Sequence, residues 1–162
     1  MSKQQSILFE KIKSIMPVTT RFKINHRPDW LKNDKTGCNY EIDIFIPEFK
    51  IGVEYQGVYH FKNKLESNTK TDYVRYNDDR KQYLAKENRG VTIIEFFEDD
   101  LTNPDFQELF LQRVKARCKM QVVKKFMRRF KSKQWKDNKA IARQRRIIEQ
   151  SPKTDINGMY VL

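Results

Sequence analysis

YEIDIFIPEFKIGVEYQG, residues 40–57, decides the fold of this chain. Apolar and polar residues alternate through 40–46 and again through 51–56, and a period of two is typical of β-strands. The four residues between these runs have a normal length for a hairpin loop. The sequence therefore predicts two antiparallel strands joined by a tight loop, with acids at positions that strand formers usually occupy.

Two of these acids are predicted to face each other. If residues 46 and 51 pair, Asp43 lies opposite Glu54, with their Cβ atoms roughly 5 Å apart. Glu41 then lies opposite Gln56. The four polar groups share one face of the hairpin and the aliphatic side chains share the other, because the side-chain period of a strand is two.

The opposed carboxylates suggest a metal site. Two carboxylates repel each other unless a cation lies between them or one of them takes a proton. Mg²⁺ binds one or two carboxylates together with water and substrate phosphate. Asp43 and Glu54 therefore favour a metal site for phosphodiester hydrolysis. On the residues alone, a solvated sheet face without catalytic function is an equal alternative.

Asp43, the hairpin, the run Glu54-Tyr55-Gln56-Gly57 and the pair His60-Phe61 resemble the PD-(D/E)XK nuclease superfamily. Within it they are most similar to the very-short-patch-repair-like and phage-encoded endonucleases. The resemblance spans residues 27–97 and implies a restriction-endonuclease-like α/β core, with a mixed β-sheet flanked by helices. It also implies a metal-dependent DNA endonuclease of phage or mobile-element origin.

The resemblance assigns the metal to Asp43 and Glu54, with Mg²⁺ as the expected ion and Mn²⁺ as a substitute. In several members of the superfamily a glutamate of the first helix completes the site. Glu10 matches that residue by position only, and a local pair with a lysine is an equal alternative. Glu41 is a second candidate for the further ligand.

Gln56 stands where the family places a lysine that helps to position the attacking water. We expect Gln56 to orient that water or to bind phosphate, with assistance from His60 and Lys81. Residues 75–81 resemble a family helix that brings an aspartate and a basic residue to the active face. Two registers of that helix fit the pattern, namely Asp78 with Lys81 or Asp79 with Gln82.

Positive charge is concentrated in the last third of the chain. The formal net charge is +12, yet residues 113–146 alone carry +14 through fifteen lysines and arginines and one aspartate. Such asymmetry favours binding to a polyanion, and a solvated charged helix is the alternative. The residues expected to contact DNA are Arg21, Lys23, Arg27, Arg75, Lys124, Lys125, Arg128, Arg129, Lys131, Lys133, Arg143, Arg145 and Arg146.

Periodicity predicts the remaining elements. Helices are expected over 2–15 and 72–88, and strands over 18–24 and 91–97. An acidic turn over 98–100 precedes a long helix that begins near 103, and a further helix covers 139–150. Apolar residues at every fourth position form a packing seam, namely Phe110, Val114, Cys118, Val122, Phe126 and Phe130. We expect a nuclease-like core over 1–105, a basic helical extension packed on it over 106–150, and a tail over 151–162.

Composition excludes several classes of protein. Two separated cysteines argue against a disulfide scaffold and suggest a reducing cytoplasm, in a bacterial or phage-infected cell. No signal peptide or membrane span is expected. Two other functions stay open. Gln56 suggests a catalytically inactive nucleic-acid-binding protein on a nuclease fold, and the basic third alone suggests an RNA-binding protein. A homodimer is expected if both DNA strands are cut.

Overall fold

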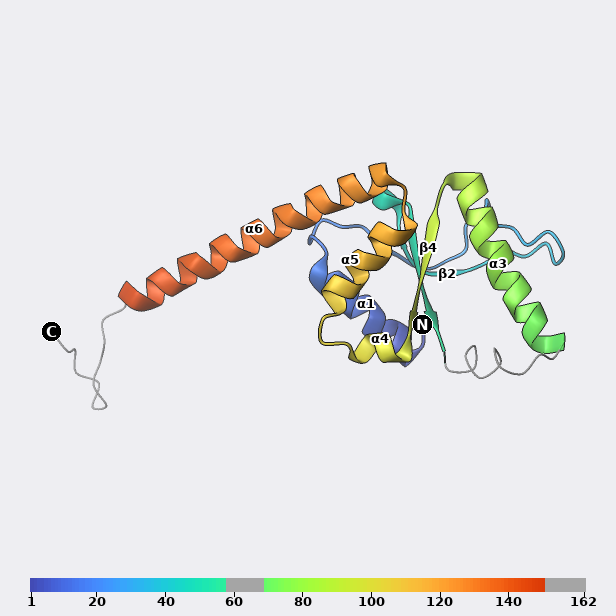
Figure 1. Ribbon diagram of the computed structural model, residues 1–162, viewed down its shortest axis with the longest axis horizontal. Coiled ribbons are helices and arrows are strands. Elements are labelled where there is room, and N and C mark those ends of the chain that lie inside the picture. Colours follow the sequence, from blue (N-terminus) through green and yellow to red (C-terminus); the bar gives the residue numbers. More distant parts are fainter. Residues whose placement is uncertain (58–68, 151–162) are drawn as a thin grey trace.

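The computed structural model describes residues 1–57 and 69–150, except for the side chains of residues 69–72, 75 and 145–150. Within these residues four strands form one sheet in the order β1-β2-β3-β4, namely β1 (Lys23–His26), β2 (Ile42–Ile46), β3 (Ile51–Gln56) and β4 (Thr92–Phe97). The first three strands are antiparallel, and β3 and β4 are parallel. The predicted mixed sheet flanked by helices is confirmed (Figure 1).

The hairpin has the predicted register near its loop, and the regular pairing ends at Ile44 and Val53, before Asp43 and Glu54. Ile46 pairs with Ile51, and Ile44 pairs with Val53. Its loop is a short 3₁₀ turn over Pro47–Phe49. Lys50 closes the turn with a positive φ of 54°, and its N–H donates to the carbonyl of Pro47. This left-handed residue reverses the chain within four residues and fixes which side chains of β2 and β3 share a face.

Strand β1 begins later than the predicted 18–24. Val18 is 99% exposed, and the segment around it is a turn in which the N–H of Thr20 donates to the carbonyl of Pro17. Of the apolar run at 15–18, Met16 is buried in the larger core cluster and Ile15 packs against it, while Val18 projects into solvent rather than entering the sheet. β1 carries its own irregularity at Asn25, which has a φ of 47°.

The first helix agrees with its prediction. α1 covers Lys3–Ile15, and Ser2 and Gln5 form a capping box at its start. Leu8 and Ile12 are buried. Ile7 is exposed, because it lies beyond the edge of the narrow stripe defined by Leu8 and Ile12.

Helix α3 (Thr69–Arg89) connects the parallel strands β3 and β4, as a parallel pair requires a crossover. It begins three residues before the predicted 72–88 and ends one residue after it, at Arg89, where Gly90 follows. Gly90 has a φ of 63°, and its N–H donates to the carbonyl of Lys86, while the N–H of Val91 donates to that of Ala85. This left-handed end directs the chain into β4.

The C-terminal third folds differently from its prediction. The acidic segment that was expected to be a turn begins a short helix, α4 (Glu98–Thr102), because acids favour the first turn of a helix. The expected single long helix is broken at Cys118, where α5 (Phe106–Arg117) ends. α6 then runs without interruption from Met120 to Gln150 and passes the boundary predicted near residue 139.

The break at Cys118 folds the apolar seam back on itself. In one straight helix Phe110 and Phe126 would lie about 24 Å apart along the axis. Their ring centroids are instead 5.8 Å apart. The predicted packing seam is thus confirmed, but as a contact between α5 and the first half of α6. Beyond Phe130 the second half of α6 projects away from the body (Figure 1).

The sheet is covered by helices on both faces. The larger core cluster joins one face of the sheet to α1, α4, α5 and the start of α6. The smaller cluster lies under α3 and includes Phe45, Ala85, Val91 and Ile93. Ile42 was expected on the face of the other β2 isoleucines, yet it belongs to the smaller cluster. The alternation of β2 changes next to Asp43, whose side chain replaces a regular ladder contact.

Candidate functional site

The two acids predicted to form the site are both buried. Asp43 is 8% exposed and Glu54 is 7% exposed. Asp43 Oδ2 accepts the N–H of Tyr55 at 2.9 Å, and Glu54 Oε2 accepts a hydrogen bond from Lys81 Nζ at 2.5 Å. Lys81 belongs to α3, which lies on this face of the sheet. The solvated sheet face considered from sequence is therefore excluded.

The environment of Glu54 favours its protonated form. Burial raises the pKa of Glu54 to about 7 against the opposing effect of the Lys81 ammonium, and the nearby carboxylates of Asp43 and Asp78 raise it as well. Within the described part of the chain, Glu54 Oε1 has no hydrogen-bond partner. A buried carboxylate with one unused oxygen and a second carboxylate beside it is costly unless a cation or a proton neutralises it.

These contacts settle the register of the second helix. Lys81 bonds to Glu54, and Asp78 lies near enough to raise the pKa of Glu54. Asp79 is exposed on the outer side of α3. Of the two alignments, Asp78 with Lys81 is therefore the one that reaches the site.

Gln56 is also buried, and its Nε2 donates to Glu95 Oε1 at 3.0 Å. Glu95 pairs in register with Glu54 across the parallel strands. Arg113 donates to the backbone carbonyl of Glu95, and Arg117 lies 3.9 Å from its carboxylate. Glu95 is thus the residue that orients Gln56. Its position between the apolar residues of β4 was the signal in the sequence that pointed to it.

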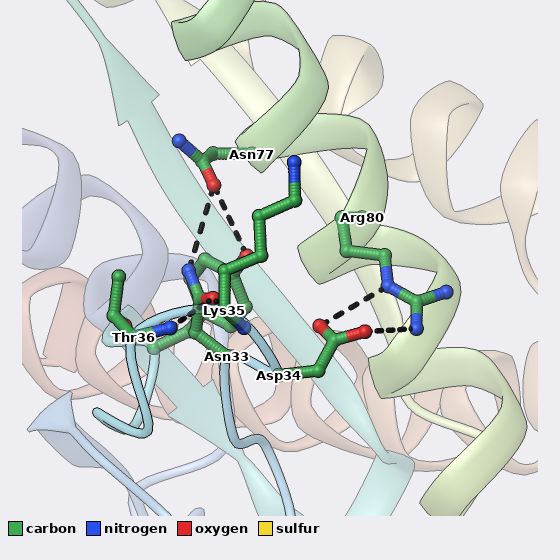
Figure 2. Close-up of polar contacts among 7 residues, drawn as sticks. Asn33, Asp34, Lys35, Thr36, Asn77 and Arg80 are labelled. Atoms are coloured by element: carbon green, nitrogen blue, oxygen red, sulfur yellow. Dashed lines mark hydrogen bonds and ion pairs between the residues drawn. The ribbon is translucent and has the colours of Figure 1, made fainter.

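A loop holds α3 against the sheet (Figure 2). Asn33 Oδ1 accepts the N–H groups of Lys35 and Thr36, and Asn33 Nδ2 donates to Asn77 Oδ1. Asp34 pairs with Arg80 at 2.5 Å. These contacts place Lys81, the next residue of α3, so that it can reach Glu54. Sequence reasoning missed this anchor, because the partners are more than forty residues apart.

Other candidates do not join the pair. Glu10 is exposed and lies 3.5 Å from Lys13, so the local pair is what the structure shows. Glu41 accepts a hydrogen bond from Arg27 at 2.9 Å. In residues 1–57 and 69–150, with the side-chain gaps noted above, no three His, Cys, Asp or Glu side chains are grouped to hold a metal ion. His60 lies outside the described residues.

Three of the residues expected to contact DNA meet in one groove. Arg21, Lys23 and Arg129 line a groove of about 910 Å³ at the loop end of the hairpin. Arg129 pairs with Glu48 at 2.9 Å, and Lys125 donates to the Glu48 carbonyl at 2.8 Å. The groove therefore joins the edge of the sheet to the first half of α6.

The other basic residues are spread along helices. Arg27 is engaged by Glu41, and Lys133 pairs with Asp137 at 2.8 Å. The exposed remainder lies on α6, namely Lys124, Arg128, Lys131 and Arg143. The side chains of Arg75, Arg145 and Arg146 fall outside the described residues. Among the described residues, no helix has the length and apolar character needed to cross a bilayer.

No family model matches the chain, and no solved structure matches it. Two viral proteins are similar to part of it. The chain is 38% identical over 77 residues to "Uncharacterized protein 307L" of Invertebrate iridescent virus 6. It is 40% identical over 72 residues to "Uncharacterized protein 033L" of Invertebrate iridescent virus 3. Each match covers 43% of this chain, and the matches cover 39% and 37% of the relatives. The chain thus spans well under half the length of the curated relatives it matches.

Proposed function

We propose that the chain is a metal-dependent DNA endonuclease with a restriction-endonuclease-like core of the PD-(D/E)XK type. The observation that carries the proposal is the buried pair Asp43 and Glu54, one oxygen of which lacks a partner in the described residues, with Lys81 beside it. The position of the acids on adjacent strands of a mixed sheet supports it. Similarity to two proteins of invertebrate iridescent viruses supports a viral origin.

The donor set fits a hard divalent cation. Asp43 and Glu54 supply carboxylate oxygens, and Glu54 Oε1 is unused within the described residues. Two carboxylates suffice for Mg²⁺, which keeps several waters and binds substrate phosphate. When bound, such an ion would polarise the scissile phosphate and make water a better nucleophile. Asp43 is kept oriented by its hydrogen bond from the Tyr55 N–H.

Lys81 supplies the positive charge that Gln56 lacks. Its ammonium contacts Glu54 and lies in a buried setting, where a charge interacts more strongly than in water. We assign to Lys81 the stabilisation of negative charge that develops on the phosphate. Gln56 is fixed through one amide proton by Glu95, which leaves further amide hydrogen-bonding capacity to orient water.

The basic surfaces supply affinity for the DNA backbone. The groove lined by Arg21, Lys23 and Arg129 opens at the loop end of the hairpin. Asp43 stands four residues from that loop along β2, which is about 13 Å at the rise of a strand. The exposed lysines and arginines of α6 continue this positive surface away from the body. Each phosphate contact increases the salt dependence of binding.

Cleavage of supercoiled plasmid tests the proposal. The protein is incubated with plasmid in Mg²⁺, in Mn²⁺ and in chelator, and nicked and linear products are separated on a gel. Asp43→Ala and Glu54→Ala should each abolish metal-dependent cleavage while duplex binding stays within about twofold. Glu10→Ala is the matched control and should cleave normally, because Glu10 pairs locally with Lys13. Cleavage retained by both site variants would refute the mechanism.

A second function is favoured by a separate observation. Gln56 replaces the lysine of the family pattern, and among the described residues no group of three His, Cys, Asp or Glu side chains is arranged to hold a metal ion. Both features suit a nucleic-acid-binding protein that does not cleave. Salt-sensitive DNA binding without nicking in Mg²⁺ or Mn²⁺ supports this function over the enzyme. Competition between DNA and RNA distinguishes either of them from an RNA-binding protein.

A further inference from the structure

One flank of α3 carries a stripe of exposed aromatic rings. Tyr73, Tyr76, Arg80 and Tyr83 are three, four and three residues apart, so they lie along one side of the helix. The three tyrosines are 51%, 44% and 55% exposed. We call these four residues the tyrosine stripe. It extends about 15 Å along the helix axis and lies beside the loop that carries Asp34 and Lys35.

Cations lie over two of the rings of the stripe. Lys35 Nζ is 4.0 Å from the centroid of the Tyr76 ring, and the Arg80 guanidinium is 5.4 Å from that of Tyr83. Figure 2 shows that Lys35 comes from the loop and Arg80 from the helix, with Asp34 holding Arg80 in place. Flat rings with flexible cations beside them match a strand whose bases are accessible and whose phosphates lie alongside.

Core packing does not account for these rings. The side of α3 that faces the sheet packs through Ala85, which belongs to the smaller core cluster. That side also carries Lys81, which bonds to Glu54. At 3.6 residues per turn the tyrosine stripe lies about 120° around α3 from Lys81, so the stripe and the candidate site occupy neighbouring sides of one helix. A nucleic-acid strand bound at the site could continue across α3 onto the stripe.

We propose that the tyrosine stripe binds single-stranded DNA by base stacking, and that the substrate has a single-stranded segment beside the bond to be cut. This inference rests on the proposed function and names its class of substrate. Bases inside a duplex are stacked on one another and cannot reach the rings. The duplex contacts therefore belong to the groove and α6, and the stripe binds the unpaired strand.

Binding at the stripe should depend on salt concentration differently from binding through phosphate contacts. Asp79 is exposed on the same helix, and Arg80 is already paired with Asp34. Stacking rather than net charge must then supply most of the affinity gained here. Loss of the rings should reduce affinity by a similar factor at low and at high salt, whereas loss of a phosphate contact reduces the salt dependence itself.

The test is fluorescence anisotropy of the full chain in chelator, which prevents cleavage, with a labelled oligothymidine and a hairpin duplex of matched length. Tyr76→Ala with Tyr83→Ala should weaken binding of the oligothymidine tenfold or more, because stacking on each ring contributes strongly. Duplex affinity should change less than twofold. The corresponding double Phe variant should bind like the original protein. Trp135→Ala removes an exposed ring of α6 and should leave single-strand binding unchanged.

Each contrary outcome has a defined meaning. The proposal that the stripe binds single-stranded DNA is wrong if the double Ala variant binds oligothymidine unchanged. It is also wrong if that variant loses affinity for single strand and duplex equally. If the protein binds oligouridine more tightly than oligothymidine, and the double Ala variant loses this binding, the assignment of the stripe to DNA is wrong. Circular dichroism of the variants verifies folding. If the double Ala variant loses single-strand binding but the original protein never cuts plasmid, the catalytic proposal fails. The proposal that the stripe binds single-stranded DNA is then retained. Normal cutting by a variant with unchanged binding refutes only the stripe.

Discussion

The two faces of the sheet differ in what they bury. One face packs apolar side chains against α1, α4, α5 and α6 and forms the larger core cluster. The other face, under α3, combines a small apolar cluster with three buried polar side chains, Asp43, Glu54 and Gln56. Stability should therefore depend mainly on the first face, and the second is arranged at some cost to stability. Substitutions on the two faces should differ in size and even in sign.

The largest effect is expected from Phe110→Ala on the apolar face. Phe110 is fully buried, with the rings of Phe96 and Phe126 each 5.8 Å away. Removing the ring should lower the free energy of unfolding by about 3–5 kcal/mol, measured by urea denaturation. Phe45→Ala is the matched change under α3 and should cost less, because its cluster is smaller. Equal losses would contradict the comparison between the faces.

On the polar face, Glu54→Gln should stabilise the metal-free protein at high pH. Burial raises the pKa of Glu54 from its ordinary 4.5 to about 7. Between those values the folded protein holds a proton that the unfolded chain releases, so stability falls as pH rises. The original protein should lose about 3 kcal/mol between pH 4 and pH 8 at this group, and the variant should not. Urea denaturation at both pH values in chelator measures the difference.

Lys81→Met is the control that should increase the loss of stability with rising pH, whereas Glu54→Gln should remove it. The Lys81 ammonium lowers the pKa of Glu54, so its removal should raise that pKa further. The loss of stability with pH should then continue above pH 7. In the Glu54→Gln background the same change should have little effect, since no carboxylate is left to lose its partner. An unchanged pH profile in Lys81→Met would mean that the pair does not control the site.

Gly52→Ala tests how closely the two layers pack under α3. An added Cβ would lie 3.1 Å from Ile42 Cγ2 and 3.3 Å from Ile93 Cγ1. The expected loss is about 1–2 kcal/mol from overpacking. Gly90→Ala is the contrasting control, because space is open there but φ is 63°. Gly90→Ala should lower the free energy of unfolding by about 1 kcal/mol through backbone strain alone. Repacking substitutions at Ile42 should therefore restore stability to Gly52→Ala but not to Gly90→Ala.

Local patterns predicted much of this fold. The hairpin register followed from loop length and alternation, and Ser2 and Gly90 marked the start of one helix and the end of another. The break at Cys118 could not be predicted in the same way. Every fourth residue remains apolar through it, and only packing of Phe110 on Phe126 favours a folded seam over a straight one.

The candidate site shows the same division. Alternation within the hairpin predicted that Asp43 and Glu54 share a face, and the structure buries both, although the regular pairing of β2 with β3 ends at Ile44 and Val53. The contact from Lys81 and the hydrogen bond between Gln56 and Glu95 join residues 27 and 39 positions apart. Such pairs depend on how α3 and β4 dock on the hairpin, and no local period encodes that. Glu10 illustrates the converse. It matches a family position in the sequence, but in the structure it pairs with Lys13.

The smallest effect on stability, and the sharpest contrast with Glu54, is expected at Arg129. Its ion pair with Glu48 is partly exposed, and such pairs contribute about 0–1 kcal/mol. Arg129→Ala should therefore unfold almost like the original protein at any pH between 5 and 8. If Arg129 also contacts a phosphate, the plot of log affinity for duplex DNA against log salt should become shallower by about one unit. Anisotropy titrations at several salt concentrations measure that slope. A lower affinity with an unchanged slope would mean that Arg129 acts only through Glu48, and the groove would then lose its role in backbone binding.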